Sequence, residues 1–103
     1  MKKPKLKRAG RANNEASLDE ASRERLQATL LEIVGNQLRE DNPPETQQTY
    51  ARLLGAGFSD EEARRLIAAV VSTEIYDMLK QQQPYNEARY LAALARLPKM
   101  PWE

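Results

Sequence analysis

The fold is decided by residues 59–81, which read SDEEARRLIAAVVSTEIYDMLKQ. Ser59 and Glu62 have the spacing of a capping box, in which each side chain satisfies a backbone N–H at the start of a helix. Residues 66–71 are apolar on almost every side, and further apolar residues follow as far as Leu79. A helix that is apolar all round is normally buried all round. We therefore predict a long central helix over this stretch.

A second long helix is predicted to precede this one. Ser17 and Glu20 form another potential capping box, and the apolar residues that follow recur every three or four positions. This recurrence is typical of one helix face. The helix is predicted to end near Glu40, where Asp41-Asn42-Pro43-Pro44 stops it. The apolar face comprises Leu26, Leu30, Ile33, Val34 and Leu38.

A short helix is predicted between the two long ones. Asn42 is expected to cap it, with Pro43 at its first position, because the missing N–H of a proline would be unsatisfied there anyway. Its buried edge is predicted to comprise Tyr50, Leu53 and Leu54. The helix is predicted to end at Gly55 and Gly57, since glycine accepts the positive φ common at a helix C-cap.

The last predicted helix begins after Asn86 as its cap. Tyr85 and Tyr90 stand on either side of that cap, with the spacing of a hydrophobic staple. Two prolines then prevent a helix over residues 98–102, so we predict an extended strap in which Trp102 occupies a pocket. The core face of the last helix comprises Tyr90, Leu91, Leu94 and Leu97.

These elements predict an all-α protein. No segment shows the strand-like alternation of apolar and polar residues. Residues 15–103 are therefore predicted to form a single domain, a compact four-helix bundle in the order long, short, long, short. Two short helices need not cover every apolar side of the third helix. A second copy of the chain would supply the missing neighbour, so the sequence leaves open a homodimer through this helix.

Residues 1–14 form a separate basic segment, for which we predict a flexible tail. It contains few large apolar residues, and no acidic residue precedes Glu15. Such a tail would neutralise phosphates and bind nucleic acid in a salt-sensitive way. The alternative is a solubilising extension, because no aromatic residue is interleaved for base stacking. The six basic residues are Lys2, Lys3, Lys5, Lys7, Arg8 and Arg11.

The composition excludes several kinds of chemistry. The chain has neither cysteine nor histidine, which excludes disulfides, a thiolate nucleophile, an imidazole base and histidine-containing metal sites. Residues 55–57 are not a phosphate-binding loop, since no GKS or GKT follows them. We predict that the protein is not an enzyme and has no cofactor or metal. No apolar run approaches the roughly 20 residues of a membrane span, so a cytoplasmic protein is expected.

Glu74 is the residue that fits the pattern of its helix least. At about 100° per residue it falls between Val70 and Met78, near the middle of the apolar face. A buried carboxylate needs a hydrogen-bond donor. Gln37 is similarly placed on the first helix, so we predict a Gln37–Glu74 hydrogen bond, with the Tyr50 hydroxyl as a further member. The alternative is a polar pocket, formed by the same residues, that recognises a ligand or a partner group.

Two stretches resemble known families. Residues 53–59, LLGAGFS, with Ala63 and Ile67, resemble the helix, Gly-Phe turn and helix of ubiquitin-associated-type domains. This similarity covers about twenty residues and implies a helical hairpin only, because the helix that follows it here is longer than in those domains.

Residues 36–98 are similar, more broadly, to an uncharacterised bacterial all-helical domain family of unknown function. The resemblance is carried by NQL at 36–38, EEA at 61–63, EI at 74–75 and PYNE at 84–87. It implies a bacterial, helical, cytoplasmic protein and transfers no site residues.

Three functions follow from these patterns as hypotheses. The first is a non-catalytic protein-interaction or accessory module, which binds an unknown protein partner through a helical groove or a dimer surface. The second is a nucleic-acid- or ribosome-associated accessory protein that uses the basic tail. The third is a small enzyme or ligand-binding protein centred on Glu74.

Overall fold

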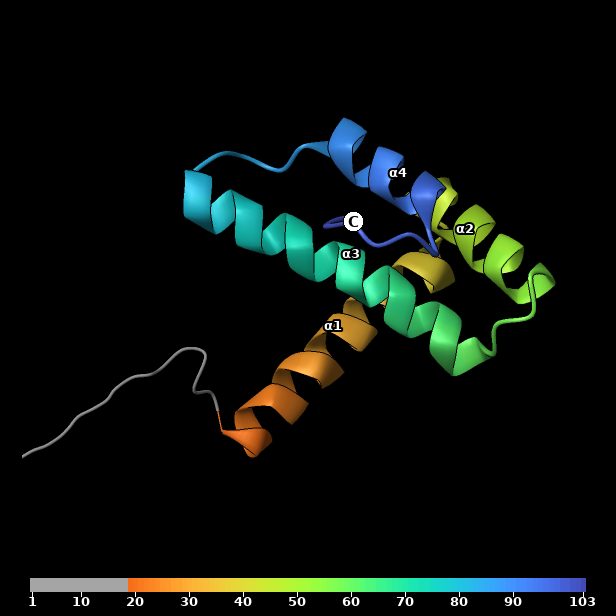
Figure 1. Cartoon of the computed structure of the whole chain (residues 1–103), viewed down its shortest axis with the longest axis horizontal. Helices are drawn as coiled ribbons and strands as arrows, with labels where there is room; N and C mark the ends of the chain where they lie inside the picture. The colour runs from red at the N-terminus through yellow and green to blue at the C-terminus, as the bar shows by residue number, and fades with distance from the viewer. Residues whose placement is uncertain (1–18) are drawn as a thin grey trace, which may run out of the picture.

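The computed structural model describes residues 19–103, which form four helices and no strand (Figure 1). Their lengths of 21, 12, 22 and 10 residues confirm the all-α fold and the order long, short, long, short. The basic residues predicted to contact nucleic acid lie outside the described range. The helices are α1 (Glu20–Glu40), α2 (Pro44–Gly55), α3 (Asp60–Gln81) and α4 (Glu87–Arg96).

The third helix is central, as predicted. α3 contacts each of the other three helices, and α1 crosses it near its middle (Figure 1). Apolar side chains from all four helices meet along one side of α3 and are buried there. Together they form one continuous core. Its buried members are Leu30, Val34, Leu53, Ala63, Ile67, Ala68, Val70, Val71, Tyr90, Leu94 and Leu97.

The predicted starts of α3 and α4 are confirmed. Ser59 Oγ accepts from the Glu62 backbone N–H at 3.1 Å, and Glu62 Oε1 accepts from the Ser59 backbone N–H at 2.9 Å. Asn86 caps α4 by accepting a backbone N–H three residues further on, at 3.0 Å. The Tyr85 and Tyr90 rings pack with their centroids 6.1 Å apart across this cap. Both helices therefore begin where local sequence rules place them.

The start of α1 differs from the prediction. Asp19 is the cap and accepts from the Ser22 backbone N–H at 2.8 Å, so Glu20 is the first helical residue and not the third. Both serine and aspartate are good caps, but the aspartate carboxylate also interacts favourably with the positive end of the helix dipole. That backbone hydrogen bond lowers the pKa of Asp19. Ser17 itself lies outside the described residues.

The N-cap predicted for α2 is wrong, and at its C-terminus only one of the two predicted glycines has a positive φ. The cap is Pro43, not Asn42, and Pro44 is the first helical residue. A residue that precedes a proline is disfavoured in the helical region, which keeps Pro43 extended at φ −75° and ψ 153°. At the other end the positive φ, +104°, belongs to Gly57, whereas Gly55 is the last helical residue.

α3 is not buried on all sides, and the uncovered part is its C-terminal half, in line with the expectation that two short helices need not cover every apolar side of it. Leu79 is 76% exposed, and Tyr76 and Ile75 are also exposed. At 1.5 Å per residue α3 is about 33 Å long, whereas α2 and α4 are about 18 and 15 Å long. Two helices of these lengths leave one side of the C-terminal half uncovered. Leu26, predicted to lie on the apolar face of α1, is likewise 48% exposed, and Leu54, predicted on the buried edge of α2, is 39% exposed.

The pocket predicted for Trp102 is absent from the described residues. Trp102 is 67% exposed, and it is Met100, two residues earlier, that packs against the core. Leu97 is buried and ends α4, so the chain leaves the core almost at once after the helix. The strap reaches the core through its methionine, and the indole stays outside the core.

Candidate functional site

Glu74 is buried as predicted, but its partner is different. Among residues 19–103 it is the only buried acidic residue, at 5% exposed. Arg89 Nε, in the first turn of α4, donates to both carboxylate oxygens at 3.1 and 3.0 Å. This hydrogen bonding raises the pKa of Arg89 above its usual value. The buried charge is therefore paired, and the predicted Gln37–Glu74 hydrogen bond is wrong.

Gln37 connects three helices instead. Its Oε1 accepts from Thr46 Oγ1 on α2 at 2.7 Å and from the Tyr90 hydroxyl on α4 at 2.8 Å. A carbonyl-type oxygen has two lone pairs, so these two donors use its full accepting capacity. Burial raises the pKa of the Tyr90 hydroxyl. The sequence did not indicate Thr46 as a member of this network.

Tyr50 belongs to a different cluster at the start of α3. Its hydroxyl donates to Asp60 Oδ1 at 2.5 Å, and Arg64 Nε donates to the same oxygen at 2.8 Å. The Arg64 guanidinium also lies 5.4 Å from the centroid of the Tyr50 ring. The hydrogen bond from Arg64, followed by that from Tyr50, lowers the pKa of Asp60, and the bond to Asp60 raises the pKa of Tyr50. Tyr50 is therefore not a neighbour of Glu74 in a shared network.

Gln37 and Glu74 do line one hollow, although they do not bond to each other. The hollow has a volume of about 210 Å³ and lies between α1, α3 and the residues that begin α4. Its one charged wall residue, Glu74, is neutralised by Arg89. The remaining wall offers a surface for an apolar side chain more than for a charged ligand. The other lining residues are Ile33, Val71, Ile75, Met78, Tyr85 and Tyr90.

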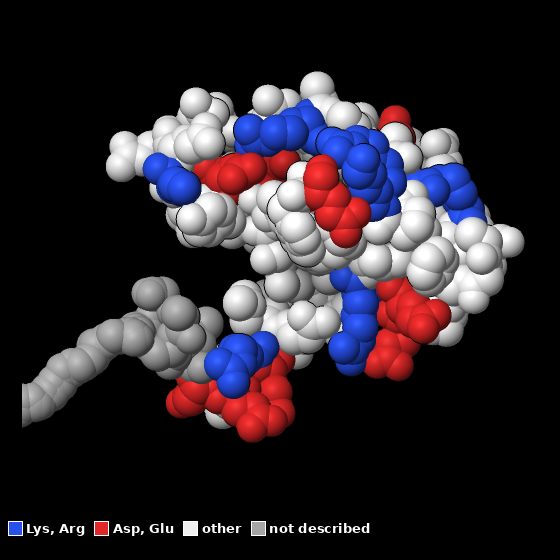
Figure 2. Space-filling view, in the orientation of Figure 1, with Lys and Arg blue, Asp and Glu red and all other residues white. Residues whose placement is uncertain are grey.

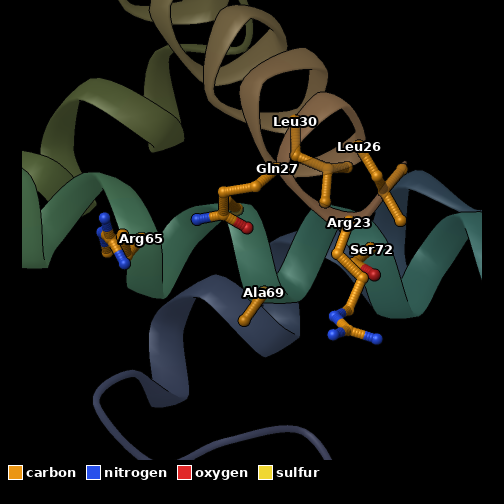
Figure 3. A pocket seen from close by; sticks show the side chains of 8 residues that line it. Arg23, Leu26, Gln27, Leu30, Arg65, Ala69 and Ser72 are labelled. Carbon is orange, nitrogen blue, oxygen red and sulfur yellow. The ribbon is translucent and has the colours of Figure 1, made fainter. Parts of the chain in front are cut away.

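A second hollow, of about 300 Å³, lies where α1 crosses α3. Figure 3 shows Leu26 and Leu30 reaching from α1 toward α3, with Ala69 and Ser72 on the α3 side. Arg23, Gln27, Arg65 and Ala68 complete the lining. The crossing is therefore open on the side where Leu26 is exposed.

The two helices diverge from this crossing as half-helices that we call the arms. The α1 arm comprises residues 20–30 and the α3 arm residues 72–81. Leu26 on the first arm, and Ile75, Tyr76 and Leu79 on the second, are exposed. Figure 2 shows charged side chains gathered at the free end of α1 and an uncharged, hollowed surface between that end and the body of the molecule. The arms therefore expose apolar side chains on both helices.

Residues 19–103 contain neither a cluster of metal ligands nor a helix that could span a membrane. No three acidic side chains in this part of the chain lie close enough to hold a metal ion. None of its helices combines the length and the hydropathy needed to cross a bilayer.

Comparison with protein-family models, curated proteins and solved structures finds no match to this chain. The two family resemblances therefore stay predictions.

Proposed function

We propose that this chain is a non-catalytic protein-interaction module, whose arms bind an apolar helix of another polypeptide. The observation that carries this proposal is the exposure of apolar side chains on two half-helices that diverge from one crossing.

Both arms present apolar side chains to solvent. Leu26 is exposed on the α1 arm, one turn before the buried Leu30, and Ile75 and Leu79 are exposed four residues apart on the α3 arm. Apolar side chains at helical spacing normally face a neighbouring helix. An amphipathic helix laid between them would cover both, which is a common mode of peptide recognition.

The α1 arm also has little packing within the chain to stabilise its helical conformation. A helix of about ten residues is marginal in water, because nucleation is unfavourable and most helix stability in proteins comes from packing. In residues 20–29 no side chain is buried. A partner on this arm would supply the packing that the rest of the chain does not provide.

The polar residues that the sequence singled out favour a binding role over a catalytic one. The carboxylate of Glu74 is paired with Arg89, and the amide oxygen of Gln37 accepts two hydroxyls. The Tyr50 hydroxyl is bound to Asp60. Each of these groups links helices of this chain, so none is poised to act on a substrate.

A cross-linking experiment tests the proposal. The chain has no cysteine, so a photoreactive maleimide can be placed at one position in Leu26→Cys, Leu79→Cys or the control Leu54→Cys. Leu54 is an exposed leucine on α2, away from the arms. We expect the same polypeptide to be cross-linked to Leu26→Cys and to Leu79→Cys, and not to the control Leu54→Cys. Once purified, this polypeptide should bind the Leu79→Glu variant about tenfold or more weakly than it binds the Leu54→Glu variant.

Equal cross-linking at the three positions would contradict this assignment, as would the lack of any product from the two arm positions. Either outcome would remove the arms as the binding surface.

The runner-up function rests on the distribution of charge. Six of the 16 basic residues precede Glu15, whereas the remaining ten share the rest of the chain with all 15 acidic residues. A nucleic-acid- or ribosome-associated accessory protein would use these first residues to contact phosphates. The test is RNA and DNA binding against salt concentration, for the full chain and for a chain that begins at Glu15. A steep salt dependence that is lost in the shorter chain would favour this function over the first.

A further inference from the structure

We infer that the hollow lined by Gln37 and Glu74 binds a phenol, that is, a small uncharged aromatic ring that carries one hydroxyl group. This inference goes beyond the proposed function, because the hollow takes a small ligand and does not depend on a helix between the arms. Three properties of the wall carry it: the size of the hollow, its apolar and aromatic surface, and polar groups that can form further hydrogen bonds.

The size of the hollow suits one aromatic ring with a small substituent. Its volume is about 210 Å³. An engineered apolar cavity of about 150 Å³ is large enough to bind benzene. Ile75 and Tyr85, which line the hollow, are 39% and 50% exposed. The hollow is therefore accessible from solvent, and a ligand can enter it without unfolding of the chain.

The surface of the wall favours an aromatic ligand. Tyr85 and Tyr90 contribute two rings, whose planes are inclined by 56° and whose centroids are 6.1 Å apart. Met78 adds a thioether, and sulfur packs favourably at the edge of an aromatic ring. An aromatic ligand would contact these rings and this sulfur, which stabilise it beyond the burial of its area alone.

The carboxylate of Glu74 can accept a further hydrogen bond from a ligand. One N–H of Arg89 is shared between its two oxygens, which together offer about four lone-pair sites. Glu74 is 5% exposed, so little water reaches the sites that remain. A hydrocarbon in the hollow would leave them without a donor, which is costly for a buried charged group. A hydroxyl group on the ligand supplies this donor.

Gln37 provides the complementary donor on the same wall. Its amide oxygen accepts two hydroxyls, but among residues 19–103 no acceptor lies within hydrogen-bonding distance of its amide nitrogen. A hydroxyl group is both a donor and an acceptor, so it matches the two polar groups of this wall.

The charge at the hollow selects an uncharged ligand. Arg89 approaches Glu74 from α4, does not line the hollow, and neutralises the carboxylate. An ammonium group on the ligand would bring an unpaired positive charge close to Arg89, whereas a carboxylate group would meet Glu74 directly. Either charge would leave water without gaining a partner.

The experiment is an NMR titration of the full, isotope-labelled chain with phenol. We expect saturable shifts of the backbone amide signals of the residues that line the hollow. Anisole has the same ring and oxygen but no donor proton, so it should bind about tenfold or more weakly than phenol. The charged analogues benzylamine and benzoate should also bind about tenfold or more weakly.

A free phenol and the tyrosine side chain of a peptide offer the same chemistry, and N-acetyltyrosinamide distinguishes these two sources. If phenol binds more tightly than this compound, the natural ligand is a free molecule. The reverse order identifies a tyrosine side chain as the group that occupies the hollow.

Two pairs of measurements on variants tie the binding to this hollow. Ile75→Trp places a larger side chain in the wall and should weaken phenol binding about tenfold or more, whereas Leu79→Trp, one turn further along α3 and outside the hollow, should leave it unchanged. Arg89→Met removes the charge that neutralises Glu74. This variant should therefore bind benzylamine about tenfold or more tightly than the wild type does, a gain that misfolding cannot produce.

Four outcomes would overturn the inference. They are the lack of saturable shifts at the hollow, anisole that binds as tightly as phenol, equal weakening by the two tryptophan substitutions, and an Arg89→Met variant with no gain in affinity for benzylamine. The cross-linking at the arms is measured without any of these ligands, so the proposed function stands or falls separately.

Discussion

Replacing Gln37 with methionine tests whether one amide oxygen holds α1, α2 and α4 together. The hydroxyls of Thr46 and Tyr90, which are 0% and 1% exposed, both donate to that oxygen. Methionine has nearly the volume of glutamine but only a weak acceptor, so both buried hydroxyls would lose this oxygen and could pair only with each other. One of the two hydroxyl protons would then have no acceptor, at a cost of about 1–3 kcal/mol. We expect the free energy of unfolding to fall by about 2 kcal/mol.

Urea unfolding followed by circular dichroism measures this change. Tyr90→Phe and Thr46→Val each remove one donor and leave the acceptor satisfied by the other, so each should cost only about 1 kcal/mol. The triple variant Gln37→Met, Thr46→Val, Tyr90→Phe lacks every member of the network. Its free energy of unfolding should therefore return most of the way to that of the wild type. Gln48→Met, at an exposed position on α2, is the control. If Gln37→Met costs no more than this control, the hydroxyls find other partners and the oxygen is not the link between the helices.

Three further predictions concern other parts of the chain. Arg89→Met should lower the Tm more than Glu74→Met. The first variant leaves the buried carboxylate of Glu74 unpaired, whereas the second leaves the partly exposed guanidinium of Arg89, which can turn to water. Thermal unfolding of both variants measures the difference. Hydrogen bonds from Arg64 and Tyr50 hold the pKa of Asp60 below its usual value of 3.8. The stability that these bonds contribute is therefore fully present above pH 3.8 and is lost as the pH falls through the lowered pKa. Unfolding measured against pH should therefore show a weaker acid dependence for Asp60→Asn than for the wild type. Gly57→Ala should destabilise the chain by roughly 1–2 kcal/mol in urea unfolding because φ is +104°, whereas Gly55→Ala, inside α2, should have no such cost.

Features that depend on neighbours in the sequence were predictable. The Ser59 capping box, the Asn86 cap and the packing of Tyr85 on Tyr90 involve residues at most five positions apart. Their geometry is set by the first turn of a helix, whatever lies around it. Where two adjacent residues compete for the cap, as at the start of α1, local rules do not decide between them.

Partners on different helices were not predictable. The helical spacing correctly placed Glu74 on the buried face of α3 and Gln37 beside the same hollow. Which donor reaches the carboxylate depends on how far α4 is shifted along α3, and that shift is fixed by the interdigitation of side chains. Arg89 could have been suspected only as a basic residue next to Tyr90 in the last helix. No periodicity in one helix gives its register against another.

Folding and association should be separable in this molecule because they use different side chains. α2 and α4 are short and cover α3 along one side only, where the continuous core lies. Leu26, Ile75 and Leu79 are not part of that core. A charged residue on an arm therefore meets water in the single chain and costs little there, whereas in a complex it would be buried without a partner. Substitutions on the arms should consequently weaken association strongly while leaving urea unfolding of the isolated chain almost unchanged.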